Sequence, residues 1–598
     1  MKSASLCWGQ RYMWLRVHQL PPEHQHETHV VLRFQVPGGL SVAQCRAMLT
    51  HLARRHEILR TTYRLEPEPA QRVEPPGPLP VTVATTERDG TPGPADVVDE
   101  LGRRPFDLGG EWPVRACLIT SGGVPKQCVL VFNHLAVDAW TLDEIKRELR
   151  TQAAGLASRR PAALAPVRHQ PSDLARHEAS ADAAIVAARS MAYWQEGVAR
   201  LPRDPFARRR RPAEGAGHAT LVSPALLAAG RRVAARHGVW PSLVTVAAYA
   251  AMTALYTGQR VVGCRVFAGN REAHPYPDVL TCMFSPMLVT VDASGDPPFR
   301  ELVRRLADGF ERAREHAYVP YDKVVEMISR EGSRRGGEVR LGSEVNFIKQ
   351  RTKEYGGRRT AFTWNPEPVS WARCELDTYL RIDEWRDAVS LSLHAAAAVM
   401  GREDVEWFLR GMEALVLAED RADDSADDSA GARAGDSAGA RAGDSAGARA
   451  GGGAGARAGD RAGVRAAVAA GPPPLAPPPQ PRSPQPPPAE PPPDPAATDP
   501  AVTDAAVTDA AVTDAAVAAL AEAVRETHGL PHVDPSDSYV LAGGLALRVP
   551  RVLALLRERG WEGLTLHQLT GPAPLGALAA RLAPGPRTPS TQIPSSSE

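Results

Sequence analysis

Two periodicities of apolar residues alternate along the first two thirds of the chain. Short apolar runs predict buried strands, and segments whose apolar residues recur every three or four positions predict helices that are buried along one face. The apolar run 128–132 leads into a polar turn, and a capping box (Thr-Leu-Asp-Glu, 141–144) then predicts the start of a helix. Further strands are predicted at 29–34, 81–85, 114–119 and 261–267, and helices at 42–57, 224–237 and 241–256. The pattern predicts a large mixed α/β region.

The pattern stops near residue 419. An eight-residue Ala/Gly/Arg/Asp repeat, a proline tract (472–495) and a five-residue Thr-Asp-x-Ala-Val repeat follow, and they contain few large apolar side chains. Such a composition cannot offset the entropy of ordering, so we predict a disordered linker at 419–516. It is also typical of a high-GC bacterial gene. Helical periodicity returns at 517–583, which predicts a small helical domain, and 584–598 is predicted to be a disordered tail.

Composition narrows the function classes. The 598 residues are enough for two or three domains, and the formal net charge of +1 gives no electrostatic basis for nucleic-acid binding. The seven cysteines are scattered without a Cys-x-x-Cys pair, and the histidines at 24–29 have no placed fourth ligand, so neither a disulfide framework nor a metal site is predicted. We find no signal peptide and no apolar run near 18 residues. A cytoplasmic protein without membrane contact is therefore expected.

The most informative polar residues are His134 and Asp138. They occupy the turn between the strand at 128–132 and the helix that follows, and loops on a rigid scaffold often carry binding and catalytic groups. Taken alone, the pair is more typical of a histidine that is hydrogen-bonded at a strand end.

This stretch resembles a known motif. Asn133-His134-x-x-x-Asp138-Ala139 is similar to the His-His-x-x-x-Asp-Gly signature of nonribosomal peptide synthetase condensation domains, with Asn133 and Ala139 as departures. The run 55–63 is nearly identical to the Arg-His-Glu-x-Leu-Arg-Thr-x-Phe motif of that family. Further segments resemble its other motifs in the right order, at 3–15, 268–271, 282–289, 316–324 and 341–350.

The resemblance implies a fold and a reaction. Two chloramphenicol-acetyltransferase-like lobes, 1–170 and 171–418, are expected to meet in a V around a tunnel. His134 would lie midway along this tunnel and orient or deprotonate an attacking amine or hydroxyl, which forms an amide or ester with a carrier-bound acyl thioester.

Supporting roles follow from the same resemblance. Asp138 is expected to orient the site through an ion pair with Arg271, and Asn133 to hydrogen-bond locally. Trp140 is expected to support the site. Ala139 replaces a glycine, and its methyl group is expected to crowd the reacting groups.

The small C-terminal domain resembles a peptidyl carrier. Residues 537–548 align with the carrier motif Asp-Ser-Phe-Phe-x-Leu-Gly-Gly-[Asp/His]-Ser-Leu, but Ala546 stands where the phosphopantetheine serine should be. Pro550 is expected to kink the next helix or delay its start. We therefore expect no covalently bound cofactor on this chain. Substrates would arrive on the phosphopantetheine of carrier proteins in trans.

Two alternatives remain open from the sequence. One is an acyltransferase of the same fold that uses acyl-CoA or a free acceptor. The other is a non-catalytic recruitment or scaffold domain, which Asn133, Ala139, Pro286 and Ala546 together suggest.

Overall fold

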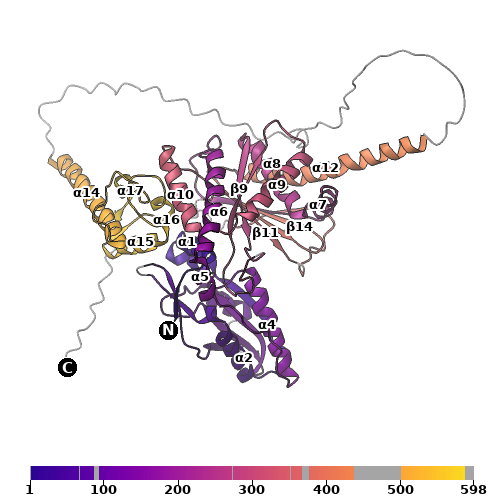
Figure 1. Cartoon of the computed structure of the whole chain (residues 1–598), viewed down its shortest axis with the longest axis horizontal. Helices are drawn as coiled ribbons and strands as arrows, with labels where there is room; N and C mark the ends of the chain where they lie inside the picture. The colour runs from indigo at the N-terminus through magenta and orange to yellow at the C-terminus, as the bar shows by residue number, and fades with distance from the viewer. Residues whose placement is uncertain are drawn as a thin grey trace, which may run out of the picture.

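The computed structural model describes residues 2–65, 68–85, 93–272, 274–350, 352–366, 376–436 and 500–585. Two sheet-based lobes form the body of the molecule, and a small helical domain lies beside it (Figure 1). Long helices project from both sides of this body, α12 (Arg402–Asp436) from the second lobe and α14 (Pro500–His528) from the small domain.

The first lobe is built on a four-stranded sheet in the order β2-β7-β6-β5. Strand β7 is central and its second half is fully buried, as its unbroken apolar run requires. Helices α2 and α4 cover the sheet and complete the core. The bounds are β2 Val30–Gln35, β5 Val81–Thr85, β6 Val114–Ser121, β7 Val124–Phe132, α2 Val42–Arg55, α3 Pro94–Arg103 and α4 Ala139–Ala157.

A short three-stranded sheet and helix α1 connect this lobe to the second one. The strands run in the order β1-β4-β3, and α1 lies between the lobes. The bounds are β1 Lys2–Ser5, α1 Trp8–His18, η1 Pro22–Thr28, η2 Glu57–Arg60, β3 Thr61–Arg64, β4 Ala70–Val73, α5 Pro171–Glu178 and α6 Ala181–Arg200.

The second lobe has a seven-stranded sheet in the order β10-β9-β11-β13-β14-β8-β12. Helix α8 is apolar on all sides and is buried in the core of this lobe. The bounds are β8 Ala216–Ser223, α7 Pro224–His237, α8 Pro241–Thr257, β9 Val261–Ala268, β10 Ser285–Asp292, α9 Phe299–Glu315, α10 Tyr321–Arg334, β11 Ser343–Lys349, β12 Ala361–Trp364, β13 Thr378–Glu384 and β14 Val389–Ala396.

Pro286 lies in β10, the edge strand of this sheet. A proline has no N–H for a sheet ladder, and an edge strand is the place in a sheet that tolerates this loss.

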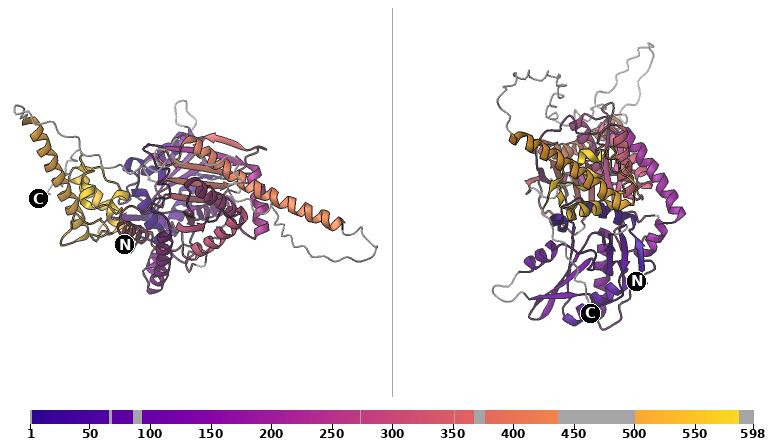
Figure 2. Two further views of the ribbon diagram at one scale, coloured as in Figure 1. Left: turned by 90° about the horizontal axis from the view of Figure 1, so that it is seen from above. Right: turned by 90° about the vertical axis from the view of Figure 1, so that its left-hand side faces the viewer.

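The small C-terminal domain packs against α1 and α10 of the body, and Figure 2 shows the domain beside the body from two further sides. It consists of α14, η3 Ala546–Arg548, α15 Val549–Glu558, β15 Trp561–Glu562, α16 Leu566–Leu569, α17 Leu575–Ala579 and β16 Ala583–Pro584. Pro550 occupies the first turn of α15, where a missing N–H costs no hydrogen bond. The helix accordingly starts after the carrier-like motif, as predicted.

Two helices extend into the segment 419–516 that was predicted to be a linker. Helix α12 continues to Asp436, and α14 already begins at Pro500. Alanine has the highest helix propensity of all residues, and the Ala-rich composition that indicated a linker also favours extension of the flanking helices. The rest of the predicted linker, residues 437–499, lies outside the described residues. Of the predicted tail, Pro584 belongs to β16, and residues 586–598 lie outside the described residues.

By length and composition, no single helix among the described residues could cross a membrane, and only α7 and α8, which meet at 102°, are apolar enough as a pair.

Candidate functional site

The site is built on the turn that joins β7 to α4. The Asn133 side chain accepts a hydrogen bond from the Leu135 N–H (3.0 Å), and the backbone N–H of Asn133 donates to the Pro113 carbonyl (3.0 Å). The first contact is an Asx turn, which fixes the backbone around His134. Asn133 therefore hydrogen-bonds locally, as expected for a residue that replaces the first histidine of the motif.

Asp138 is the N-cap of α4 and is almost fully buried (4% exposed). One carboxylate oxygen accepts from the Thr141 N–H (2.8 Å), and the other accepts from the Met283 N–H (3.1 Å) and from Arg271 (2.9 Å). Both oxygens are thus occupied by hydrogen-bond donors. This arrangement suits a group that holds the site together, and it leaves little capacity for proton transfer.

Arg271 joins the two lobes. Besides Asp138, it donates to the Thr141 hydroxyl (3.2 Å) in the first lobe, and to the backbone carbonyls of Val279 (2.8 Å) and Thr281 (3.0 Å) in the second lobe. Its guanidinium also lies 4.0 Å from the centre of the Trp140 ring. The predicted Arg271–Asp138 pair is present.

His134 is half-buried, and its Nδ1 is enclosed by the protein without a hydrogen bond of normal geometry. Burial lowers the pKa of this imidazole below its usual value, and nearby backbone groups and the Asp138 carboxylate only partly oppose the shift. At neutral pH the ring is therefore in the form that can accept a proton.

Aromatic rings surround the imidazole. Phe284 lies 5.3 Å from His134, centre to centre, and it packs in turn against Phe267 (5.5 Å) and Tyr12 (5.6 Å). Tyr12 also contacts Tyr321 edge-on at 5.1 Å. We call these four residues, Tyr12, Phe267, Phe284 and Tyr321, the aromatic cluster.

Two cavities reach this cluster from different sides. A cleft of about 1140 Å³ has Phe267, Trp140 and Arg271 among its lining residues, and a smaller pocket of about 100 Å³ is lined by Tyr12 and Tyr321. Neither of these two cavities is lined by His134 itself. The tunnel with His134 midway along it therefore stays a prediction.

Ala139 lies at the first position of α4, where its side chain is exposed. The expected crowding of the reacting groups by its methyl group stays a prediction. Trp140 is partly exposed and lines the large cleft beside Arg271.

Sequence reasoning missed how Gln10 supports the turn. The segment 3–15 indicated packing only, yet the buried Gln10 amide donates to the Leu135 carbonyl (3.4 Å) beside His134 and accepts from the Cys7 N–H (2.9 Å). Its match to the opening motif of the family was the available signal.

A buried carboxyl group near the cleft was also missed. Glu178 accepts hydrogen bonds from the Tyr318 hydroxyl (2.5 Å) and the Trp8 N–H (2.8 Å). Burial raises the pKa of Glu178 to about 8, although these hydrogen bonds and Arg11 favour the charged form. No sequence pattern pointed to this residue.

Comparison with known proteins identifies the family. The family model described as "Condensation domain" matches residues 3–413. The chain belongs to the condensation domain family. The condensation-domain fold predicted from the motifs is thereby confirmed.

Curated relatives are much longer than this chain. The probable non-canonical nonribosomal peptide synthetase CymA of Salinispora arenicola is 29% identical over 377 residues, which are 60% of this chain and 5% of the relative. Chondramide synthase cmdD of Chondromyces crocatus is 25% identical over 308 residues, 49% of this chain and 8% of the relative. The chain thus spans less than a tenth of the length of these relatives.

Solved structures share the fold. The X-domain from teicoplanin biosynthesis matches with a TM-score of 0.54 and 20% identity, covering 70% of this chain and 96% of that one. The structure describing condensation-domain-mediated chain release from the enacyloxin polyketide synthase matches with a TM-score of 0.54 and 19% identity, covering 70% and 82%.

Proposed function

We propose that this protein condenses a carrier-bound acyl thioester with an amine or hydroxyl acceptor in natural-product biosynthesis. The observation that carries the proposal is a neutral, half-buried His134 fixed between Asn133 and a fully hydrogen-bonded Asp138. Carrier proteins in trans are the proposed partners, because Ala546 offers no hydroxyl to which phosphopantetheine could be attached.

In the proposed reaction, the nitrogen or oxygen of the acceptor attacks the thioester carbonyl carbon. The new C–N or C–O bond forms, the C–S bond breaks, and His134 accepts the acceptor proton and returns it to the leaving thiolate. The enclosed Nδ1 leaves Nε2 as the nitrogen available to substrate. General-base catalysis of this kind typically contributes about 10²–10⁴-fold to the rate.

Positioning is the second contribution of the site. Arg271 and Asp138 hold the two lobes and the catalytic turn in one geometry, and Phe284 of the aromatic cluster packs beside the imidazole. Orienting two bound reactants can lower a barrier more than proton transfer does.

The test is turnover by the His134→Ala protein with acyl thioesters on a carrier protein, compared with the same acyl groups on CoA. We expect a loss of about 10²–10⁴-fold in kcat with the carrier-bound donor. His51→Ala, a substitution of an exposed histidine on α2, is the matched control and should retain full turnover. Equal rates for His134→Ala and the wild type would remove this residue from the reaction, and a preference for CoA would favour an acyl-CoA transferase.

A further inference from the structure

The C-terminal domain, residues 512–585, is held against the body through polar contacts that both partners bury. The Trp14 indole N–H donates to the Leu547 carbonyl (3.2 Å), and the Ser329 hydroxyl donates to the Gly571 carbonyl (3.2 Å). Trp14 is on α1 and Ser329 on α10, and both side chains are almost fully buried. We call this contact surface of the body the α1–α10 face.

Ala546 lies at the centre of this contact. It is 0% exposed, and its N–H donates to the Glu326 carboxylate on α10 (3.2 Å). The residue that stands in for the phosphopantetheine serine is thus turned into the α1–α10 face. A tethered arm at this position would have no exit to solvent.

Charged pairs surround the buried centre. His567 lies 2.8 Å from Glu338, and Arg548 donates to Glu68 (2.8 Å). Burial would raise the pKa of Glu338, but His567 and Arg340 outweigh it and lower the pKa to about 2. These pairs contribute specificity of docking more than strength, because they are partly exposed.

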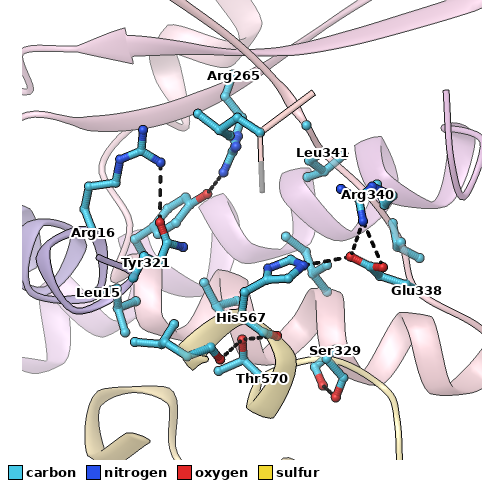
Figure 3. Close-up of a pocket in the computed structure, with 18 of the residues that line it drawn as sticks. Leu15, Arg16, Arg265, Tyr321, Ser329, Glu338, Arg340, Leu341, His567 and Thr570 are labelled. Carbon is cyan, nitrogen blue, oxygen red and sulfur yellow. Dashed lines mark hydrogen bonds and ion pairs between the residues drawn. The ribbon is translucent and has the colours of Figure 1, made fainter. Parts of the chain in front are cut away.

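The docked domain also closes one approach to the site. The pocket of about 100 Å³ has one wall from the body, including Tyr12, Arg16 and Arg265, and another from the C-terminal domain, including His567 and Thr570 (Figure 3). Tyr12 belongs to the aromatic cluster beside His134. The larger cleft, on the Trp140 side, is lined by residues of the body alone.

From this arrangement we infer that the C-terminal domain is a built-in cap: it occupies the α1–α10 face as a carrier that cannot be loaded, and it excludes a second carrier there. One substrate then arrives on a carrier through the open cleft, and the attacking amine or hydroxyl arrives as a free small molecule. This inference rests on the proposed function for its chemistry, while the docking itself does not.

Docking is tested by a disulfide in the full-length protein. A Cβ atom built on Gly332 of α10 would lie 3.2 Å from the Cβ of Pro572, close to the separation of about 3.5–4.5 Å in disulfides. The Gly332→Cys/Pro572→Cys protein should form this bond on mild oxidation, detected by peptide mass spectrometry. The six cysteines among the described residues are all buried, which limits competing bonds.

A variant that should release the C-terminal domain from the α1–α10 face makes the disulfide test specific. Ser329→Arg places a long charged side chain into the contact with Gly571 and should suppress the disulfide at least tenfold in rate. Ser158→Arg, on an exposed helix end of the first lobe, is the matched control and should leave the rate unchanged. If the cysteine pair stays reduced under conditions that oxidise exposed thiols, docking in solution is refuted.

The second measurement asks which acceptor the capped protein uses. The donor is a carrier protein loaded with an acyl group, and the acceptors are free amino acids or the same amino acids loaded on a carrier protein. The oxidised Gly332→Cys/Pro572→Cys protein should form product with free amino acids as fast as the reduced form and the Gly332→Cys single variant do. It should form none with carrier-borne ones.

The outcomes separate the two proposals. Two outcomes would overturn the inference that the C-terminal domain is a cap. One is product formation that is lost on oxidation and restored by reduction, and the other is efficient use of carrier-borne acceptors by the wild type. If the wild type, the oxidised and reduced cysteine variants and Ser329→Arg all form no product, the proposed function and the use of a free acceptor are both overturned. Disulfide formation then tests only whether the C-terminal domain docks on the α1–α10 face.

Discussion

The buried charge pair of Asp138 and Arg271 is the residue-scale feature on which the site geometry depends. Asp138→Ala removes the acceptor for Arg271 and for two backbone N–H groups. We expect it to destabilise the protein by about 3–5 kcal/mol, because it leaves a buried guanidinium uncompensated. Arg271→Ala should cost a similar amount, and the double variant less than the sum of the two single variants.

Urea denaturation of the four proteins in this cycle is the measurement. Arg386→Ala is the control, because Arg386 pairs with Glu354 at 2.6 Å while both side chains are mostly exposed (73% and 54%). Its cost should be at most about 1 kcal/mol. If the loss of stability in the double variant equals the sum of the losses in Asp138→Ala and Arg271→Ala, the two residues do not act as a unit.

Glu178 makes stability depend on pH. Its folded-state pKa of about 8 lies above the usual 4.5, so the folded protein holds a proton that the unfolded chain has released at neutral pH. The stabilisation from this proton is complete below pH 4.5 and is lost as the pH rises through 8. Glu178→Gln has no such loss, so its Tm relative to the wild type should rise between pH 5 and pH 9.

Thermal unfolding of both proteins across that range tests the sign. Glu522→Gln is the control, since Glu522 forms only an exposed helix pair with Arg525 and should show no rise relative to the wild type at alkaline pH. A Tm difference between Glu178→Gln and the wild type that is constant with pH would mean that Glu178 is ionised in the folded protein.

Residues close together in sequence were predictable, and distant ones were not. Asn133, His134 and Asp138 fall within one turn, so the strand and capping signals alone brought them together. Arg271 was predicted only through the family resemblance, because no local pattern links positions 138 and 271. Glu178 and Tyr318 are 140 residues apart and meet only in the folded chain.

At the scale of elements, the approach of α1 to the segment before β10 depends on a glycine. A Cβ on Gly9 would overlap the Cys282 carbonyl oxygen and lie 2.6 Å from the Met283 Cα, and both are backbone atoms that cannot move aside cheaply. Gly9→Ala should therefore destabilise the protein by about 1–3 kcal/mol and lower turnover, since Met283 also donates to Asp138.

Gly230→Ala in α7 is the control for this prediction. A Cβ there meets nothing within 4 Å, and alanine is the better helix former, so we expect stabilisation of about 0.5–1 kcal/mol. Chemical denaturation measures both effects. Equal changes in stability for the two variants would show that the contact of α1 with residues 282–283 is loose.

Elements with strong periodicity were predicted well, and their arrangement was not. The apolar run before His134 became β7, and α2 and α7 start where expected. The order of the seven-stranded sheet, in which β11 lies parallel between β9 and β13, depends on long-range pairing that has no local signal. Helices α12 and α14 extend into the predicted linker because its alanines favour helix, which the overall composition did not indicate.

At the scale of the whole molecule, the sequence predicted a carrier-like domain that cannot be loaded, but not its place. Trp14, Ser329 and the Gly571 turn look like ordinary helix and loop residues, and nothing in their spacing indicates an interface. Trp14 belongs to one continuous apolar core that includes α1, α10 and the C-terminal domain, and Ser329 hydrogen-bonds to Gly571 beside it. A small domain that shares a core with its partner depends on that contact for part of its stability, because the fraction of surface that a domain buries falls with its size.

This dependence predicts how the protein unfolds. In scanning calorimetry, the C-terminal domain of the wild type should melt together with the body in one transition. In Ser329→Arg it should melt separately, at least about 5 °C lower, since a loss of 1 kcal/mol shifts the Tm of a domain of this size by about 4–8 °C. Ser158→Arg should keep the single transition. The contrary outcome is two transitions in the wild type, with the lower Tm unchanged in Ser329→Arg. It would mean that the α1–α10 face adds nothing to the stability of the C-terminal domain. The domain would then be loosely held, and a competing carrier could displace it.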